Sequence, residues 1–344
     1  MSYFTRTRLM TFAISALGVV AFLLLHLPLP LLLGPMLGCL IAAFAGAKLQ
    51  DSGIFGVFMR TFLGVAVGSS ITPAILGQLQ QFAGSLIFVP AYIAVIGALG
   101  YPLFRYGFGF NHATAWYSAM PGGLQDMLVF GEEAGGDVRA LSLIHATRVL
   151  VVVTIAPLVM VSYWGVDLTK PPGVAASEIA LSQLGLMVFA GLAGWKIAER
   201  VGLFGASILG PMILTAALSI GGVITHRPPA EIIWASQFFI GIAVGVKYAG
   251  ITLRELRVCV GAGVVYALLL ALISLGFIEL IHVFHLAPPK DAFLAYLPGG
   301  QAEMVVIAIL AGADLAFVVS HHLLRIILVI MIGPLVERRL RRPS

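Results

Sequence analysis

The strongest constraint on this chain is that its two halves repeat one pattern of residues 177 positions apart. Pro121-Gly122-Gly123 recurs as Pro298-Gly299-Gly300. Other pairs at this offset include Gly64/Gly241, Gly68/Gly245, Asp126/Glu303, Met127/Met304, Gly135/Gly312, Asp137/Asp314, His145/His322, Arg148/Arg325 and Pro157/Pro334. Leu33-Gly34-Pro35-Met36 matches Leu209-Gly210-Pro211-Met212 one residue out of step. Repeats that each place helix breakers beside ionisable residues are typical of membrane carriers.

The composition predicts an integral membrane protein. Hydrophobic residues make up 60% of the chain and charged residues 10%, whereas about a quarter of the residues of soluble domains are charged. Arg6 and Arg8 precede the first apolar stretch, and no small-residue cleavage site follows, so we expect an uncleaved first helix. The arginines after the last apolar stretch indicate a cytoplasmic anchor and not a nucleic-acid arm. They are Arg338, Arg339, Arg341 and Arg342.

Apolar stretches long enough to cross a bilayer predict five spanning helices in each half. They cover residues 9–26, 31–47, 54–72, 85–103 and 141–164, then 179–198, 204–224, 232–250, 258–282 and 315–336. A polar linker at 166–177 separates a first repeat at 1–165 from a second at 178–338, which a basic tail follows at 339–344. The predicted fold class is therefore an all-α polytopic membrane protein of two homologous repeats.

Each half also contains one unusual apolar segment, at 111–133 and at 291–311, with Pro-Gly-Gly near its middle. Each arm has about ten residues, which at about 1.5 Å per residue crosses half of the hydrocarbon core. Proline and two glycines break a helix. Each segment is either a broken helix that crosses completely or a re-entrant hairpin with its tip at mid-membrane.

The positive charges favour the hairpin and, with it, an inverted second repeat. In that arrangement one set of basic residues lies on the cytoplasmic side: Lys48, Arg105, Arg139, Lys196, Arg200, Arg254, Arg257 and the C-terminal arginines. A smaller set lies outside: Lys170, Arg227 and Lys290. If both segments cross fully, the repeats run parallel and four of the cytoplasmic residues move outside. Both arrangements place the N-terminus and the C-terminus inside.

The Pro-Gly-Gly tips predict an anion site near the bilayer centre. Irregular backbone at that depth occurs only where protein or a water-filled cavity satisfies its polar groups. We expect free N–H groups of Gly122, Gly123, Gly299 and Gly300 at the start of each second arm, where a helix N-terminus attracts anions. The alternative is that these glycines only allow close packing of helices.

Three of the ionisable residues that recur after each tip are candidates for this site. Asp126 and Glu303 lie one turn into the second arm, where a buried acid is costly and is a candidate for binding H⁺ or Na⁺. Arg148 and Arg325 lie too deep to reach water, and each shares a helix face with His145 or His322. We expect the arginines to hold an anionic substrate and the histidines to exchange protons. Structural ion pairs between the acids and the arginines, and histidines that only pack, are the alternatives.

Other repeated residues have simpler interpretations. Asp137 and Asp314 precede helices, which predicts N-caps. Gly64-x3-Gly68 and Gly241-x3-Gly245 predict close helix packing. Lys247 and His321 lack counterparts, because Ser70 and Ile144 occupy the equivalent positions. We interpret Lys247 as a candidate site charge and His321 as less important.

The Pro-Gly-Gly repeats, with Leu-Gly-Pro-Met in each half, resemble the membrane family named for its AbrB duplication, over about residues 27–336. Its members are labelled as ammonia monooxygenases or AbrB-family transcriptional regulators. The family is similar to cation/proton antiporters and to bile-acid and glutamate symporters, which implies inverted repeats whose broken helices meet at midplane. The resemblance implies a site at 121–126 with His145 and Arg148, and at 298–303 with His322 and Arg325.

We therefore expect a secondary transporter of the cell inner membrane that moves a small anionic solute, coupled to H⁺ or Na⁺. It is expected to be no enzyme, to need no metal or cofactor and to bind no nucleic acid; homo-oligomerisation stays open. A second hypothesis is a membrane regulator of gene expression that acts indirectly or through a protein partner. A membrane monooxygenase is third, because the sequence offers no recognisable copper or iron ligand motif.

Overall fold

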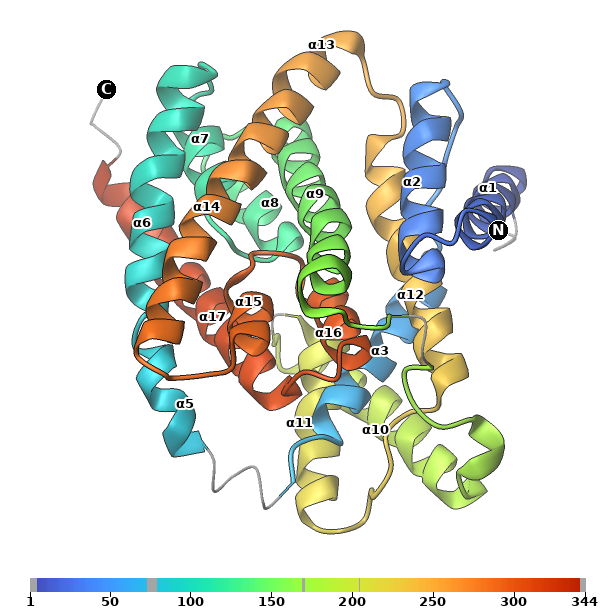
Figure 1. Cartoon of the computed structure of the whole chain (residues 1–344). Helices are drawn as coiled ribbons and strands as arrows, with labels where there is room; N and C mark the ends of the chain where they lie inside the picture. Colours follow the sequence, from blue (N-terminus) through green and yellow to red (C-terminus); the bar gives the residue numbers. More distant parts are fainter. Residues whose placement is uncertain (1–4, 73–78, 169–170, 204, 341–344) are drawn as a thin grey trace. The chain divides into compact units, whose positions relative to one another are not determined.

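The computed structural model describes residues 5–72, 79–168, 171–203 and 205–340, and every regular element in these ranges is helical (Figure 1). The α-helices are α1 Arg6–Leu24, α2 Pro30–Phe44, α3 Ile54–Gly68, α5 Leu79–Leu86, α6 Val89–Pro102, α7 His112–Ala119, α8 Leu124–Glu133, α9 Val138–Trp164, α10 Leu181–Arg200, α11 Ala206–Ile220, α12 Ala230–Gly245, α13 Leu253–Glu255, α14 Gly261–Val283, α15 Pro289–Tyr296, α16 Gln301–Leu310 and α17 Leu315–Leu340. Short 3-10 or π turns are η1 Leu103–Gly107, η2 Ala176–Glu178, η3 Val246–Tyr248 and η4 Leu256–Val260. Lys170, Arg341 and Arg342 lie outside the described residues.

The predicted all-α class is confirmed, and each expected span contains a helix. Among the described residues, seven helical stretches are long and apolar enough to cross a membrane: Arg6–Leu24, Phe82–Gly107, Val138–Trp164, Leu181–Arg200, Ala230–Tyr248, Leu253–Val283 and Leu315–Leu340. The other three expected spans, α2, α3 and α11, have 15 residues each. At about 1.5 Å per residue they measure roughly 22 Å, less than the hydrocarbon core of about 30 Å.

The chain divides into two compact units, and each takes segments from both halves of the sequence. Unit 1 comprises Met1–Leu79, Pro157–Gly250 and Ala302–Ala316. Unit 2 comprises Gln80–Ala156, Ile251–Gln301 and Phe317–Ser344. These units are defined by which segments pack together and not by which segments repeat in sequence. The limits of the two sequence repeats therefore stay a prediction.

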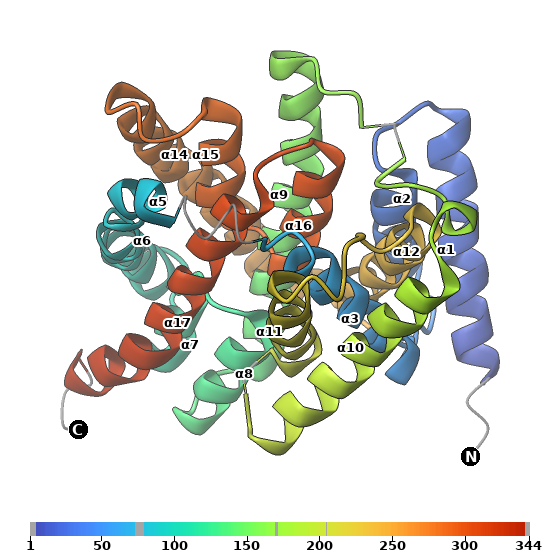
Figure 2. The ribbon, with the colours of Figure 1, turned by 90° about the horizontal axis from the view of Figure 1, so that it is seen from below.

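Unit 1 is built from two similar groups of helices. Helix α2 packs on α1 and α12, and α11 packs on α10 and α3 (Figure 2). The short α2 and α11 carry the two Leu-Gly-Pro-Met sequences in their N-terminal halves. Each group therefore combines helices from one half of the chain with a third helix from the other half.

Close approach of backbones holds these groups together. A Cβ on Gly64 would lie 2.2 Å from the Ile208 carbonyl oxygen, and one on Gly241 would lie 2.3 Å from that of Leu32. Such distances leave no room for a side chain. The predicted close packing of the two Gly-x3-Gly sequences is therefore confirmed, as small residues allow in membrane helices.

Unit 2 contains both Pro-Gly-Gly breaks. Helix α6 packs on α7 and on α14, and α14 packs on α15 (Figure 1). Asp137 caps α9, because its Oδ1 accepts a hydrogen bond of 3.0 Å from the Ala140 amide. That predicted N-cap is confirmed, and it fixes the start of the long helix that carries His145 and Arg148.

Candidate functional site

The first broken segment folds back on itself. Helix α7 ends at Ala119 and α8 begins at Leu124, with Pro-Gly-Gly between them. The Asp137 amide, just beyond α8, donates a hydrogen bond of 2.8 Å to Thr114 Oγ1 in the first turn of α7. Because the start and the end of the segment meet, the segment is a hairpin and not a helix that continues in one direction. The second segment has arms of the same lengths, α15 with eight residues and α16 with ten.

The glycine amides at the two breaks differ. No backbone acceptor among the described residues receives a hydrogen bond from Gly122 or Gly123. The Gly299 amide, in contrast, donates to the Leu297 carbonyl oxygen at 2.9 Å. The tight turn at the second break therefore uses one of the four amides that the sequence predicts to be free.

Arg148 and Arg325 make equivalent contacts with the breaks. Arg148 Nη2 donates to the Gly122 carbonyl oxygen at 3.2 Å, and Arg325 Nη2 donates to that of Gly299 at 3.4 Å. Both side chains are buried, with exposed fractions of 1% and 3%, and both belong to unit 2. Their placement inside the protein, predicted from their depth in apolar helices, is confirmed.

Arg325 retains donors that no described residue accepts. Its Nε and Nη1 are buried and have no hydrogen-bond partner in the described part of the chain. No described carboxylate lies within ion-pair distance of it either. Burying a cation without a counter-charge is unfavourable by several kcal/mol. This guanidinium therefore presents unused donors to any anion that reaches it.

The histidines hold the first arm of each broken segment. His145 Nε2 donates to the Tyr117 carbonyl oxygen at 3.0 Å, and His322 Nε2 donates to that of Leu294 at 2.9 Å. Arg325 Nη2 lies 3.3 Å from His322 Nδ1. Because arginine can only donate, Nδ1 must accept, so the His322 ring is neutral with its proton on Nε2. This geometry favours a positioning role over the proton exchange that we expect from the sequence.

Two tyrosines that sequence reasoning missed complete this arrangement. Tyr266 on α14 donates to the Ala119 carbonyl oxygen, and Tyr92 on α6 donates to that of Tyr296 at 2.5 Å. Both acceptors lie two residues before the proline of a break. Each tyrosine thus satisfies a carbonyl that the break removes from its helix, and it does so from the other half of the chain.

The two predicted coupling acids fall in different units. Asp126 is half-buried in the first turn of α8, beside Gly123, and pairs with no cation among the described residues. Asp126 therefore forms no ion pair with Arg148 or with Arg325, which is the alternative interpretation of this acid. Glu303 is buried in the first turn of α16, in unit 1. The predicted site residues other than Glu303 all belong to unit 2.

The two residues without counterparts have separate environments. His321 is buried, with Nδ1 2.8 Å from the Phe317 carbonyl oxygen and Nε2 2.9 Å from Ser85 Oγ. Both ring nitrogens are thus used within the protein, which agrees with a structural role. Lys247 is half-buried in η3, directly after α12 in unit 1. Lys247 therefore belongs to a different unit from all the candidate site residues except Glu303.

Comparison with known proteins gives relatives over nearly the full length. The chain is 27% identical over 332 residues to "Putative regulator AbrB" of Escherichia coli (strain K12), with 94% of each chain covered. It is 27% identical over 339 residues to "Uncharacterized protein YhjN" of Bacillus subtilis (strain 168), with 88% of this chain and 86% of the relative covered. The model of the family described as "Transition state regulatory protein AbrB" matches residues 31–341. The chain therefore belongs to the AbrB family, as its repeated Pro-Gly-Gly and Leu-Gly-Pro-Met sequences suggest.

Proposed function

We propose that this protein is a secondary transporter for a small organic anion. One observation carries the proposal: Arg325 is buried at a helix break, and two of its guanidinium nitrogens have no acceptor among the described residues. A carboxylate matches the planar fork of arginine and can accept two parallel hydrogen bonds. Arg148, buried at the other break in the same unit, adds a second positive charge.

The backbone at the first break adds donors of its own. Gly122 and Gly123 lie at the N-terminus of α8, where the helix dipole favours negative charge. Transport, rather than permanent binding, is proposed because the glycines at the breaks allow the arms to change their angle. The proposed process is binding and release of an unchanged solute, so no chemical step on it is required.

Asp126 and Glu303 are the proposed coupling residues. Each lies in the first turn of a helix that follows a break, and Asp126 has no cation partner among the described residues. A carboxylate in this position can bind H⁺ or Na⁺, which neutralises its own negative charge. His145 and His322 are proposed to position the first arms. The proposed location is the cell inner membrane, with both termini cytoplasmic.

Uptake by proteoliposomes tests the transport proposal. Purified full-length protein would be reconstituted, and uptake of acetate, succinate and citrate would be measured with an imposed pH or Na⁺ gradient. We expect one gradient to drive uptake of at least one carboxylate. We expect Arg325→Met to abolish that uptake, while Arg254→Ala, which changes an exposed arginine of the same unit, leaves it unchanged. Uptake that does not depend on either gradient would contradict coupling.

A second candidate function is a membrane-embedded regulator that acts through a protein partner. The name of the Escherichia coli relative favours it. This hypothesis predicts a stable complex after gentle solubilisation and no solute uptake in the assay above. A complex that survives purification together with absent flux would favour the regulator over the transporter.

The proposed topology has its own test. In the inverted arrangement, a cysteine that replaces Glu178, in η2 after the linker, would react with a reagent added outside. A cysteine that replaces Glu132, in α8, would react from the cytoplasmic side, where both ends of the first hairpin lie in that arrangement. Native Cys39 and Cys259 are buried, so they add little background. Labelling of the Glu178→Cys variant only from the cytoplasmic side would contradict five spans in the first half.

A further inference from the structure

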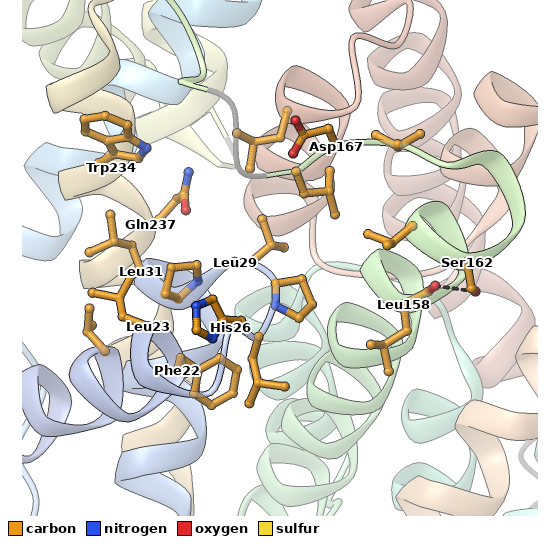
Figure 3. Close-up of a pocket in the computed structure, with 18 of the residues that line it drawn as sticks. Phe22, Leu23, His26, Leu29, Leu31, Leu158, Ser162, Asp167, Trp234 and Gln237 are labelled. Carbon is orange, nitrogen blue, oxygen red and sulfur yellow. Dashed lines mark hydrogen bonds between the residues drawn. The ribbon is translucent and has the colours of Figure 1, made fainter.

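A pocket in unit 1, apart from the proposed anion site, has the features of a ligand site. Its volume is about 900 Å³, within the range of about 300 to 1,000 Å³ that is typical of small-molecule sites. It is formed by the end of α1, the start of α2, the end of α9 with the following loop, and α12 (Figure 3). Most of its lining is aliphatic or aromatic, as at Phe22, Leu23, Leu31 and Leu158.

One buried polar side chain in this lining has no partner. Gln237 extends from α12 into the pocket, and its exposed fraction is 2% (Figure 3). Its Nε2 has no hydrogen-bond partner in the described part of the chain. Leaving a buried amide unsatisfied costs about 1 to 3 kcal/mol. A ligand that offers a hydrogen bond at this point would recover that loss.

The backbone around the pocket supports the same conclusion. Among the described residues, three non-glycine residues have positive φ, and two of them, His26 and Leu29, line this pocket. Their φ values are 52° and 53°. Positive φ is strained in residues with a side chain and concentrates at ligand sites. The loop between α1 and α2 is therefore held in a shape that forms one wall.

The charges of the lining select against an anionic ligand. Asp167 lines the pocket and is exposed, whereas the described lining residues include no lysine or arginine. The described lining therefore offers no lysine or arginine as a counter-charge for a phosphate or a free carboxylate. A neutral polar group suits this environment better, with its apolar part against the aliphatic walls.

We propose that this pocket binds a neutral single-chain acyl ester, such as a monoacylglycerol. The acyl chain lies against Phe22, Leu23 and Leu158, and the ester carbonyl accepts a hydrogen bond from Gln237 Nε2. The glycerol hydroxyls can donate hydrogen bonds to the side-chain Oε1 of Gln237 and to polar groups at the rim of the pocket. This binding site is independent of the proposed anion site, because its lining residues belong to unit 1.

Photolabelling tests the proposal. A monolauroylglycerol with a diazirine in its acyl chain would be added to the purified full-length protein, and the labelled peptides would be identified by mass spectrometry. We expect labels on peptides that contain α1 or the end of α9. Gln237→Leu should weaken binding about three- to tenfold, which corresponds to one hydrogen bond. Ser162→Trp, which fills the pocket from an exposed lining position, should abolish it.

Three controls make the result decisive. Ala94→Phe changes a second, apolar pocket in unit 2 and should leave labelling unchanged. Gln237→Glu tests the amide by a second substitution and should also weaken labelling. Equal labelling of wild type, Gln237→Leu and Ser162→Trp would overturn the proposal. Displacement of the probe by laurate or by diacyl phosphatidylcholine as readily as by unlabelled monolauroylglycerol would overturn the choice of a neutral single-chain ligand.

Discussion

The Tyr266 hydroxyl donates a hydrogen bond to the Ala119 carbonyl oxygen, the acceptor two residues before the first Pro-Gly-Gly break. The Tyr92 hydroxyl serves the equivalent carbonyl of Tyr296 before the second break. Each half of the chain thus stabilises the broken helix of the other half. The two halves therefore interact at the helix breaks, where backbone carbonyl groups lack hydrogen-bond donors within their own helix.

Removal of either tyrosine hydroxyl is expected to destabilise the protein. In Tyr266→Phe the buried Ala119 carbonyl oxygen loses its side-chain donor, which costs about 1 to 3 kcal/mol. The loss in Tyr92→Phe should be smaller, because Ser274 Oγ also donates to the Tyr296 carbonyl oxygen, at 3.1 Å. The apparent melting temperature of the purified variants measures the loss. Tyr106→Phe changes a tyrosine that is 78% exposed and should melt like the wild type. Equal melting temperatures for all three variants would show that these hydrogen bonds are not needed.

The close packing in unit 1 predicts opposite effects for two glycine substitutions. In Gly64→Ala the new methyl group would lie 2.2 Å from the Ile208 carbonyl oxygen, so α3 and α11 must separate. We expect poor folding and a lower melting temperature. Gly185→Ala, in α10 of the same unit, meets no atom within 4 Å and should be neutral or stabilising by up to about 1 kcal/mol. A melting temperature for Gly64→Ala at or above that of Gly185→Ala would contradict this packing.

The contacts of His322 predict that its role depends on the hydrogen bond it donates to the Leu294 carbonyl oxygen and not on a change in its protonation. The amide introduced by His322→Gln can still donate to the Leu294 carbonyl oxygen, whereas the ring introduced by His322→Phe cannot. We expect His322→Phe to lower the melting temperature, and His322→Gln to keep both fold and pH dependence of uptake. His282→Phe, at an exposed position, is the control for stability. Loss of the pH dependence in His322→Gln would restore proton exchange as the role of this histidine.

Asp126 is predicted to affect coupling more than binding. Asp126→Asn removes the negative charge but keeps the size of the side chain. We expect this variant to bind the carboxylate and to lose the response of uptake to the ion gradient. Glu132→Gln changes an exposed acid on the same helix and should behave like the wild type. An unchanged gradient response in Asp126→Asn would exclude this residue as a coupling site.

Local features of the fold could be predicted from the sequence. Pro-Gly-Gly marks both helix breaks, and the structure ends α7 at Ala119 and begins α8 at Leu124 around the first of them. The small residues at Gly64 and Gly241 indicate the close contacts between helices. The depth of Arg148 and Arg325 in apolar runs indicates that they are buried. Each of these inferences depends on a few neighbouring residues.

Features that depend on packing across the chain could not be predicted. Tyr92 and Tyr266 are separated by 174 residues, so a search at the offset of 177 does not pair them. The Gly299 amide is used by its own turn, which the sequence does not reveal. The exact hydrogen-bond partner of each histidine is set by tertiary contacts. Gln237 shows no repeated pattern, because Arg60 occupies the equivalent position in the first half.

Binding of a carboxylate to purified protein tests the central claim most directly. Equilibrium binding of radiolabelled succinate, acetate or citrate would be compared for wild type, Arg325→Met and Arg254→Ala. Charge-assisted hydrogen bonds contribute about 1.5 to 3 kcal/mol each, so loss of the guanidinium should weaken binding about tenfold to a hundredfold or more. Arg254→Ala should bind like the wild type. Equal affinity in Arg325→Met, or no binding of any carboxylate by the wild type, would contradict an anion site at Arg325.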